Sequence, residues 1–543
     1  MPVNLDRRLL LKAGTLGIGA LAMPGGAVLL QGSGFTHNVA SGEPRPDQVM
    51  LWTRYVPAPA ASARLAYEVS PTRDFATVSA GGTVTADPER DWCVKPVAEG
   101  LDPGRTYFYR FVDAQGRFSP VGRTRTLPQG SVDRFKMGVF SCSNLPFGWF
   151  NAYAHAAGRD DLDLIVHLGD YLYEYQRGTY PSLPQALDGR VIEPAGEIVA
   201  LADYRMRYAA YRADTDLQRL HQMFPMVMMW DDHENANDSW TGGAENHQPE
   251  TEGDWQARKM AAMRACREWL PVSDRDWESY EIGDLATLFR LETRLTGRTR
   301  PLDLGAALAG REDLPAALVE FRDGPWRDAR RTLLGAEQEA WLAQGLKGST
   351  RRGARWQVIA QQVVMGSLSL PPEVAAFVAN GASEEVRRRT AAGLAAAQAG
   401  LPFNLDMWDG YPAARDRLLR SAQEAEANLI VLSGDSHNAW AFQLEREGVP
   451  AGVDMAVQSV TSPGYETYVP QASPEDLARA LIGGNPQLRW AEVSRRGYLT
   501  LELTPGQAIG EWQFLGTIRE RSTATSGHAL KVVNGTNRLE RVG

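Results

Sequence analysis

The chain is poor in cysteine and histidine, with 3 and 8 of them among 543 residues. The cysteines, Cys93, Cys142 and Cys266, are too few for a disulfide scaffold, and their odd number leaves at least one thiol free. So few histidines also disfavour a dizinc site built mostly of imidazole ligands. Disulfides are therefore excluded as the main stabilising element, and a metal site is expected to draw mainly on other ligands.

The chain also lacks an excess of positive charge, since 57 Lys and Arg face 66 Asp and Glu, for a net charge of −9. This balance argues against broad contact with nucleic-acid phosphates or anionic lipid, so we expect no nucleic-acid-binding surface. A long apolar run is missing as well. The mildly apolar stretch from Ala13 to Leu30 contains several glycines, and we expect no stable membrane anchor. With 43% hydrophobic residues the chain can still bury an ordinary core in two or three domains.

The N-terminus is typical of an export signal. Arg7 and Arg8 are followed by leucines and Lys12, which is the pattern of a twin-arginine signal. We therefore predict a twin-arginine signal peptide over residues 1–32, a periplasmic or secreted location, and the Tat translocase as partner during export. A basic N-terminus with a chance arginine pair is the alternative.

Short strands separated by turns characterise residues 33–128. The segments 49–55, 63–70 and 106–113 are apolar and aromatic, with proline and glycine between them. This pattern predicts a small all-β domain of the fibronectin III or immunoglobulin-like sandwich type. It contains no candidate catalytic cluster, so we interpret it as a packing or substrate-shaping module.

Beyond Leu127 strands alternate with helical stretches, which predicts an α/β layered catalytic domain over residues 132–520. We expect the stretches 177–200 and 372–400 to be insertions or lids. Residues 521–543 form a predicted C-terminal tail, either loosely ordered or packed across the mouth of the site.

Four short segments, far apart along the chain, bring acidic or thiol ligands to the end of an apolar run. Each run, MGVF, LDLIV, PMVM or LIVL, is predicted to be a buried strand. The polar residues that follow would lie at the carboxyl end of a sheet, where α/β folds bind ligands, so the layout predicts one composite metal site. The segments are FSCSN (140–144), HLGDYLYEY (167–175), MWDDHENANDSW (229–240) and LSGDSHNAW (432–440).

The first two segments favour an iron site. Asp170 follows Gly169, which lets the backbone turn sharply, and a carboxylate placed there can bridge two cations. Tyr173 can return to the same side of that turn. A phenolate ligand needs a strongly Lewis-acidic ion, so Tyr173 favours ferric iron, and a thiolate from Cys142 points the same way. The alternatives are a packing role for Tyr173 and a buried structural thiol at Cys142.

The other two segments supply mainly oxygen ligands. Asp232 and its acidic neighbours surround His233, while Asp435 and His437 arrive from another strand end. Oxygen-rich surroundings with few imidazoles favour a harder cation, such as calcium, beside the iron. A solvated charged loop is the alternative for the acidic segment, although the strongly apolar run before it would deliver the loop directly from the core.

With these motifs the chain resembles the PhoD-like alkaline phosphatases and phosphodiesterases. That family belongs to the calcineurin-like metallophosphoesterase superfamily, which also holds the purple acid phosphatases. The resemblance covers almost the whole chain and implies an α/β fold, with a metallophosphoesterase-type layered β-sandwich flanked by helices and preceded by the small all-β domain. Besides the four segments, it is carried by NVASGEPRPDQVMLWTR (38–54), LETR (291–294), RTLLGAEQEAWL (331–342), QVIAQQVVM (357–365), WDGYPAAR (408–415), SVTSPG (459–464) and RGYLTLEL (496–503).

The resemblance implies a secreted, metal-dependent hydrolase of small-molecule or polymeric phosphate esters, of the alkaline phosphatase D type. It implies Fe³⁺ and Ca²⁺ as cofactors and a metal-bound hydroxide as the nucleophile. His233 corresponds to the catalytic histidine that contacts phosphate and assists the leaving group, oriented by Glu234 or a nearby aspartate. Asn144 is expected to reach a phosphate oxygen or a metal. By motif position the iron ligands are Cys142, Asp170, Tyr173 and His437, and the calcium ligands are Asp170, Asp232 and Asp435.

Several alternatives stay open from the sequence. The superfamily has a histidine where this chain offers Gln361 and Gln362, and either glutamine is a possible ligand. Arg177 and Arg294 suit either phosphate binding or a structural ion pair. Within the hydrolase class the alternative is a phosphodiesterase or phospholipase D acting on lipid or polymer diesters. Outside it, a non-catalytic metal-binding exoprotein and an oxidative iron enzyme of the haloperoxidase kind are considered.

Overall fold

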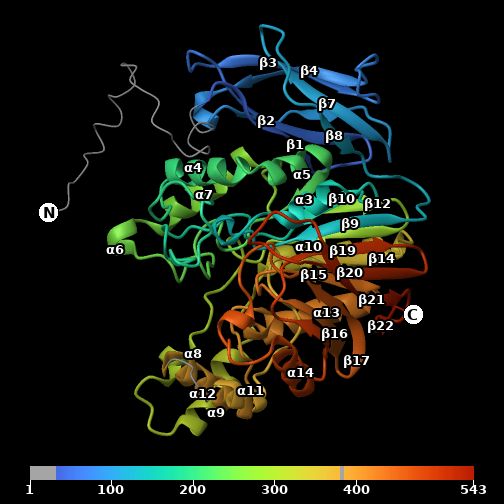
Figure 1. Cartoon of the computed structure of the whole chain (residues 1–543). Coiled ribbons are helices and arrows are strands. Elements are labelled where there is room, and N and C mark those ends of the chain that lie inside the picture. Colours follow the sequence, from blue (N-terminus) through green and yellow to red (C-terminus); the bar gives the residue numbers. More distant parts are fainter. Residues whose placement is uncertain (1–31, 379–383, 543) are drawn as a thin grey trace, which may run out of the picture.

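The computed structural model describes residues 32–378 and 384–542, so the predicted signal peptide falls outside the described residues except for residue 32 (Figure 1). The N-terminal strands lie at one end of the molecule, large sheets occupy the middle, and a group of helices lies at the other end. Within the described part of the chain, no helix has the length and apolar character needed to cross a membrane.

The N-terminal module is a small β-sandwich that shares a sheet with the rest of the protein. Its strands are β1 (Gly34–Gly42), β2 (Gln48–Val56), β3 (Ala63–Ser70), β4 (Ala80–Ala86), β5 (Cys93–Val94), β6 (Val97–Glu99), β7 (Thr106–Val112) and β8 (Gly122–Arg125). The sheet β4-β3-β7-β8 packs on β1 and β2, and Leu51 and Phe111 lie in the core between them. Strand β1 also pairs in parallel with β11 (Pro225–Met228), so the predicted all-β module is continuous with the catalytic domain.

Two sheets packed face to face form the centre of the molecule. Their further strands are β9 (Phe135–Phe140), β10 (Leu164–His167), β12 (Glu278–Ile282), β13 (Ala286–Arg290), β14 (Trp356–Ala360), β15 (Leu429–Ser433), β16 (Ala439–Arg446), β17 (Val449–Ala456), β18 (Leu488–Glu492), β19 (Gly497–Leu503) and β20 (Gln507–Leu515). One sheet runs β22-β21-β20-β19-β9-β10-β11-β1-β2-β5, with β21 (Thr525–Val533) and β22 (Leu539–Arg541) at its edge, and the other runs β12-β13-β14-β15-β17-β16-β18. Val166, Val358 and Leu432 are among the buried side chains that fill the space between the sheets.

Helices cover both outer faces of this sandwich. Tyr208 and Leu217 pack with the outer face of the first sheet, and Leu346 and Leu418 pack with that of the second. The predicted fold class, a layered β-sandwich flanked by helices, is therefore confirmed. On the first sheet lie α3 (Asn151–Ala157), α4 (Leu201–Arg212), α5 (Thr215–Met223) and α7 (Trp255–Trp269), and on the second lie α10 (Gly335–Arg351), α13 (Pro412–Glu424) and α14 (Pro474–Gly484).

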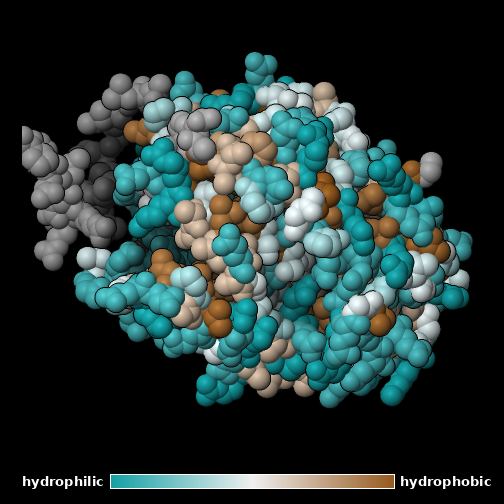
Figure 2. All heavy atoms as spheres, turned by 90° about the horizontal axis from the view of Figure 1, so that it is seen from below, coloured by the Kyte–Doolittle hydropathy of each residue, from teal (hydrophilic) through white to brown (hydrophobic). Residues whose placement is uncertain are grey.

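A small helical lobe projects from the second sheet at the lower end of Figure 1. It contains α8 (Leu304–Leu308), α9 (Leu314–Phe321), α11 (Glu373–Val378) and α12 (Glu384–Gln398). Leu318, Phe321, Ala396 and Leu401 form a separate apolar cluster within it. Figure 2, which views the molecule from this end, shows a mostly hydrophilic face with hydrophobic residues in small groups. The described part of the predicted insertion 372–400 thus belongs to this lobe, and its role as a lid stays a prediction.

The C-terminal residues differ from the prediction of a loose tail. Strands β21 (Thr525–Val533) and β22 (Leu539–Arg541) extend the first sheet, and β21 pairs with β20 along its whole length. Leu530 and Val532 point into the central core and are buried. Residues 521–543 are therefore mostly an integral edge of the catalytic domain, because the apolar face of β21 is buried on the sandwich.

Candidate metal centre

Polar side chains reach one site from the carboxyl ends of four strands, as the sequence predicted. Strands β9, β10 and β11 are parallel neighbours in one sheet, and β15 is parallel to β13 and β14 in the other. Their carboxyl ends therefore meet at the same edge of the sandwich. The arriving residues are Cys142 after β9, Asp170 and Tyr173 after β10, Asp231, Asp232 and His233 after β11, and Asp435 and His437 after β15.

The first ligand group combines sulfur, oxygen and nitrogen. Ligand atoms of Cys142, Asp170 and His437 lie within 4.8 Å of one another. The Tyr173 hydroxyl lies 3.3 Å from both Asp170 Oδ2 and His437 Nε2, and 2.7 Å from Ser462 Oγ. The structure thus brings together all four residues expected to hold iron.

The backbone of these loops is held in an uncommon conformation. Left-handed geometry costs a residue with a side chain roughly 1–3 kcal/mol and is concentrated at functional sites. Gly169, with φ of 103°, precedes Asp170, and a Cβ there would lie 2.5 Å from the backbone nitrogen of Asp231. Only glycine fits this crossing of two loops. The residues with positive φ include Cys142 (60°), Asp170 (51°), Asp435 (63°) and His437 (62°).

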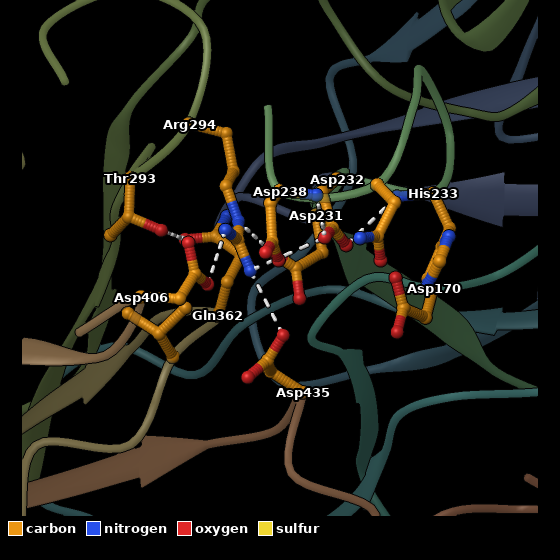
Figure 3. Close-up of polar contacts among 12 residues, drawn as sticks. Asp170, Asp231, Asp232, His233, Asp238, Thr293, Arg294, Gln362, Asp406 and Asp435 are labelled. Carbon is orange, nitrogen blue, oxygen red and sulfur yellow. Dashed lines mark hydrogen bonds and ion pairs between the residues drawn. The ribbon is translucent and has the colours of Figure 1, made fainter. Parts of the chain in front are cut away.

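The second ligand group is made of carboxylates. Atoms of Asp231, Asp232 and Asp435 lie within 4.8 Å of one another, and a third set joins Asp170, Asp232 and His233 (Figure 3). Asp170 therefore belongs to a set with the soft ligands and to a set with the hard ones. This is the arrangement that a bridging carboxylate requires.

The charge in the cluster is not balanced by the protein alone. Asp170 Oδ1 and Asp231 Oδ2 are buried without a hydrogen-bond partner. Burial raises the pKa of the Cys142 thiol and the Tyr173 phenol well above their usual values, and raises that of Asp435 to about 7. Buried anionic ligands without partners are costly unless cations pair with them. The donor set therefore fits multivalent cations.

Arg294 is a fixed cation inside the acidic group. It follows β13 and is fully buried. The sequence left open whether Arg294 binds phosphate or forms a structural ion pair. The structure shows ion pairs with three aspartates. The nitrogens of Arg294 donate to Asp231 Oδ1 at 2.5 Å, Asp406 Oδ2 at 2.7 Å and Asp435 Oδ1 at 2.9 Å.

His233 is oriented by Glu174. His233 Nδ1 lies 2.7 Å from Glu174 Oε2. The other oxygen of Glu174 accepts from the Asn237 backbone at 2.8 Å and from Asn246 Nδ2 at 2.9 Å. Because Glu174 is fully buried and held on both sides, it fixes the plane of the imidazole ring.

The expectation that Glu234 orients His233 is wrong. Both Glu234 oxygens accept backbone N–H groups, from Asp170 at 3.1 Å, Tyr171 at 2.6 Å and Asp231 at 2.8 Å. Three amides from two loops satisfy the carboxylate where it lies, so it is not available to the ring. Glu234 instead ties the loop after β10 to the loop after β11.

Asn144 contacts the segment 177–200, which also contains Arg177. Asn144 Oδ1 is buried without a partner, while its Nδ2 donates to the Tyr180 carbonyl at 3.2 Å. The free oxygen agrees with the predicted role but does not test it. Arg177 pairs with Glu193 at 3.0 Å, with both side chains 39% exposed, so it forms a surface ion pair within this segment.

The two glutamines after β14 make structural hydrogen bonds. Gln361 Oε1 accepts from Trp408 Nε1 at 3.2 Å. Gln362 Oε1 accepts from Thr293 at 2.6 Å, and its Nε2 donates to the Trp230 carbonyl at 2.9 Å. Each therefore ties the strand end to neighbouring loops.

Several residues of the site were not among the ligands predicted from the sequence. Asp231 and Asp238 lie in the acidic segment, and the Asp238 backbone donates to Asp232 Oδ2 at 2.7 Å. Burial and the nearby Asp406 raise the pKa of Asp238 well above its usual value. Glu174 lies inside the recognised segment 167–175, so its acidic character was a usable signal, whereas Asp406 has no local signal at all.

Comparisons with known proteins agree with this geometry. The model of the PhoD-like phosphatase family matches residues 137–512, and that of the PhoD-like phosphatase N-terminal domain matches residues 25–128. Alkaline phosphatase D of Bacillus subtilis (strain 168) is 31% identical over 523 residues, which cover 91% of this chain and 80% of that protein. The similarity thus spans both the module and the catalytic domain.

Solved structures show the same likeness. A structure of PhoD is 29% identical, with a TM-score of 0.76 over 94% of this chain and 93% of that one. The purple acid phosphatase PPD1 from yellow lupin (Lupinus luteus) seeds is 13% identical, with a TM-score of 0.51 over 91% of this chain and 73% of that one, which shows the fold alone. With the phosphatase model spanning residues 137–512 and a 31% identical relative covering 91% of the chain, this protein belongs to the PhoD-like phosphatase family and is a phosphoester hydrolase.

Proposed function

We propose that this phosphoester hydrolase works with a ferric ion and a calcium ion in two adjoining ligand groups that share one carboxylate. The observation that carries the proposal is the division of the cluster into unlike halves, one with thiol, phenol and imidazole groups and the other with carboxylates only. The iron half would be Cys142, Asp170, Tyr173 and His437, and the calcium half would be Asp170, Asp232 and Asp435, with Asp231 and Asp238 close by.

The identity of each cation follows from its donors. Burial raises the pKa of the Cys142 thiol and the Tyr173 phenol, so only a strongly Lewis-acidic cation would hold both as anions at neutral pH. Ferric iron meets that requirement. The other half offers only carboxylate oxygens, which suits calcium.

His233 is the proposed acid for the leaving group. When bound, the cations would polarise the phosphoryl oxygens and lower the pKa of the attacking water. Glu174 holds Nδ1 of His233, which leaves Nε2 for the leaving oxygen. Although burial favours the neutral ring, Asp232, Glu174 and Asp170 raise the pKa of His233 well above its usual value. Of these, Glu174 is not a proposed metal ligand, so it would still favour the protonated ring when the cations are bound.

Aromatic side chains wall the site on the side of His233. The ring of Tyr175 lies 5.4 Å from His233, and that of Tyr180 lies 6.5 Å from His437, centroid to centroid. Tyr180 belongs to the segment 177–200, so this predicted insertion forms part of the wall. We propose that the substrate is a small-molecule or polymeric phosphate ester that enters past these rings.

Metal analysis combined with an assay tests the proposal. Purified protein should contain iron and calcium, and chelation of calcium should remove activity that returns on adding calcium back. Para-nitrophenyl phosphate and its bis ester, assayed side by side without oxidant, would separate a phosphatase from a phosphodiesterase. Full activity in protein stripped of both metals would contradict the proposal.

We also propose export by the Tat translocase to the periplasm or beyond. Its support is Arg7 and Arg8 with the following leucines and Lys12. Replacing Arg7 and Arg8 by lysine together should keep the protein in the cytoplasmic fraction, as measured by cell fractionation and immunoblotting. Normal export of the double variant would show that another route is used.

A further inference from the structure

We infer that Arg294 is a positioning residue, which holds Asp435 of the calcium half and the neighbouring Asp231 in the orientation that a cation needs. This inference rests on the proposed function. Figure 3 shows the guanidinium between the two sheets' loops, with ion pairs to residues on three separate segments. Neither the family resemblance nor the ligand sets assigns it this role.

All three guanidinium nitrogens of Arg294 are engaged within the protein. The guanidinium is fully buried, and each of its three nitrogens is bonded to a different carboxylate. Its base is fixed as well, since the backbone N–H groups of Arg294 and Leu295 both donate to Glu292 Oε1, at 2.8 and 2.7 Å. Because both the guanidinium and the backbone of Arg294 are fixed by hydrogen bonds, the side chain acts as a brace between carboxylates and not as a phosphate-binding group.

Arg294 donates a hydrogen bond to only one oxygen of Asp231 and one of Asp435, so the second oxygen of each is left for a cation. Arg294 binds Oδ1 of Asp231, whose Oδ2 is buried without a partner. It binds Oδ1 of Asp435, for which no Oδ2 hydrogen bond is found among the described residues. A carboxylate held in this way cannot rotate, so its second oxygen keeps a fixed direction. Outer partners of this kind commonly change metal affinity by about 10–100-fold when they are removed.

Removal of the Arg294 guanidinium would have two opposing effects on calcium binding. Removing a positive charge beside the site would by itself strengthen calcium binding by electrostatics. Removing the brace would free Asp231 and Asp435 to rotate, which would weaken binding. We expect the second effect to be larger, because Arg294 holds both carboxylates directly and they lie in a buried site where an unpaired charge is costly.

Calcium titration of four proteins tests the inference. Iron-containing wild type, Arg294→Met, Arg294→Lys and Arg298→Met are freed of calcium with a chelator and titrated with calcium alone by calorimetry. Arg298 is the matched control, since it is equally buried and binds Asp406, but it does not contact Asp231 or Asp435. Iron content and melting temperature are measured on each protein.

We expect calcium affinity to fall by about 10–100-fold in Arg294→Met, with iron retained, and only slightly in Arg298→Met. Arg294→Lys should stay close to the methionine variant, because one ammonium cannot span three carboxylates. Unchanged or tighter calcium binding in Arg294→Met, or wild-type binding in Arg294→Lys, would overturn the inference. If Arg294→Met does not fold, the lysine variant decides. Absence of calcium binding in wild type would instead overturn the proposed calcium site, and the inference with it.

Discussion

Replacing Asp170 by asparagine should abolish hydrolysis and release both cations together. Asp170 lies in the group with Cys142 and His437 and also in the group with Asp232. Its Oδ1 is buried without a partner, and Oδ2 lies 3.3 Å from the Tyr173 hydroxyl. Asparagine keeps the shape but removes the charge, so neither cation keeps its shared ligand. The loss of activity should exceed the roughly 10–100-fold typical of removing an outer partner of a metal ligand.

Two single-sided variants are the controls for Asp170→Asn. Asp435→Asn should lose calcium and keep iron, whereas His437→Gln should lose iron, because each residue belongs to one half only. Metal content by mass spectrometry and the melting temperature are measured for all three. A fully folded Asp170→Asn protein that kept its iron and lost calcium alone would show that this carboxylate does not bridge.

Replacing His233 by alanine should lower kcat by about 10²–10⁴-fold while both cations stay bound. Its ring is held by Glu174 at 2.7 Å, and its proposed task is proton donation to the leaving oxygen. The loss should be larger for an alkyl phosphate than for para-nitrophenyl phosphate, whose leaving group needs less protonation. His247→Ala, which removes a histidine paired with Glu252 at 3.2 Å, is a control outside the site.

Glu174→Gln should produce a smaller loss with a distinctive pH profile. The acid works only while protonated, so activity falls as pH rises through the pKa of His233. Glu174 is one of the carboxylates that raise this pKa, and a neutral amide would no longer do so. The alkaline limb of the kcat profile should therefore move to lower pH.

The His233→Ala variant also tests the assignment of the acid. If this variant loses its metal, His233 is a ligand and not the acid.

The strand ends of this site could be predicted because their local signal is strong. Short apolar runs such as LIVL and PMVM form β15 and β11, and each is followed at once by the acidic residues. A short apolar run is enough to predict a buried parallel strand, and residues that directly follow such a run must lie at the carboxyl end of the strand. The positions of Asp232 and Asp435 could therefore be predicted. Their gathering at one edge followed from the parallel arrangement.

The partners of those residues could not be predicted in the same way. The loops decide which acid faces His233, and Glu174 rather than the adjacent Glu234 does so because three backbone amides occupy Glu234. Asp406 reaches Arg294 across 112 positions of sequence, which only the packed structure reveals. Strand β21 was likewise missed because its first half, Thr-Ser-Gly-His, lacks apolar residues and its stability comes from pairing with β20.

Cutting the chain near residue 130, between its two family regions, would uncover the flank of β11 that β1 now closes. That flank belongs to the strand that delivers Asp232 and His233, and bare amide and carbonyl groups there would invite pairing with another molecule. The module before residue 128 therefore completes the sheet of the catalytic domain. We therefore expect the catalytic domain expressed without the module to aggregate and to lose activity.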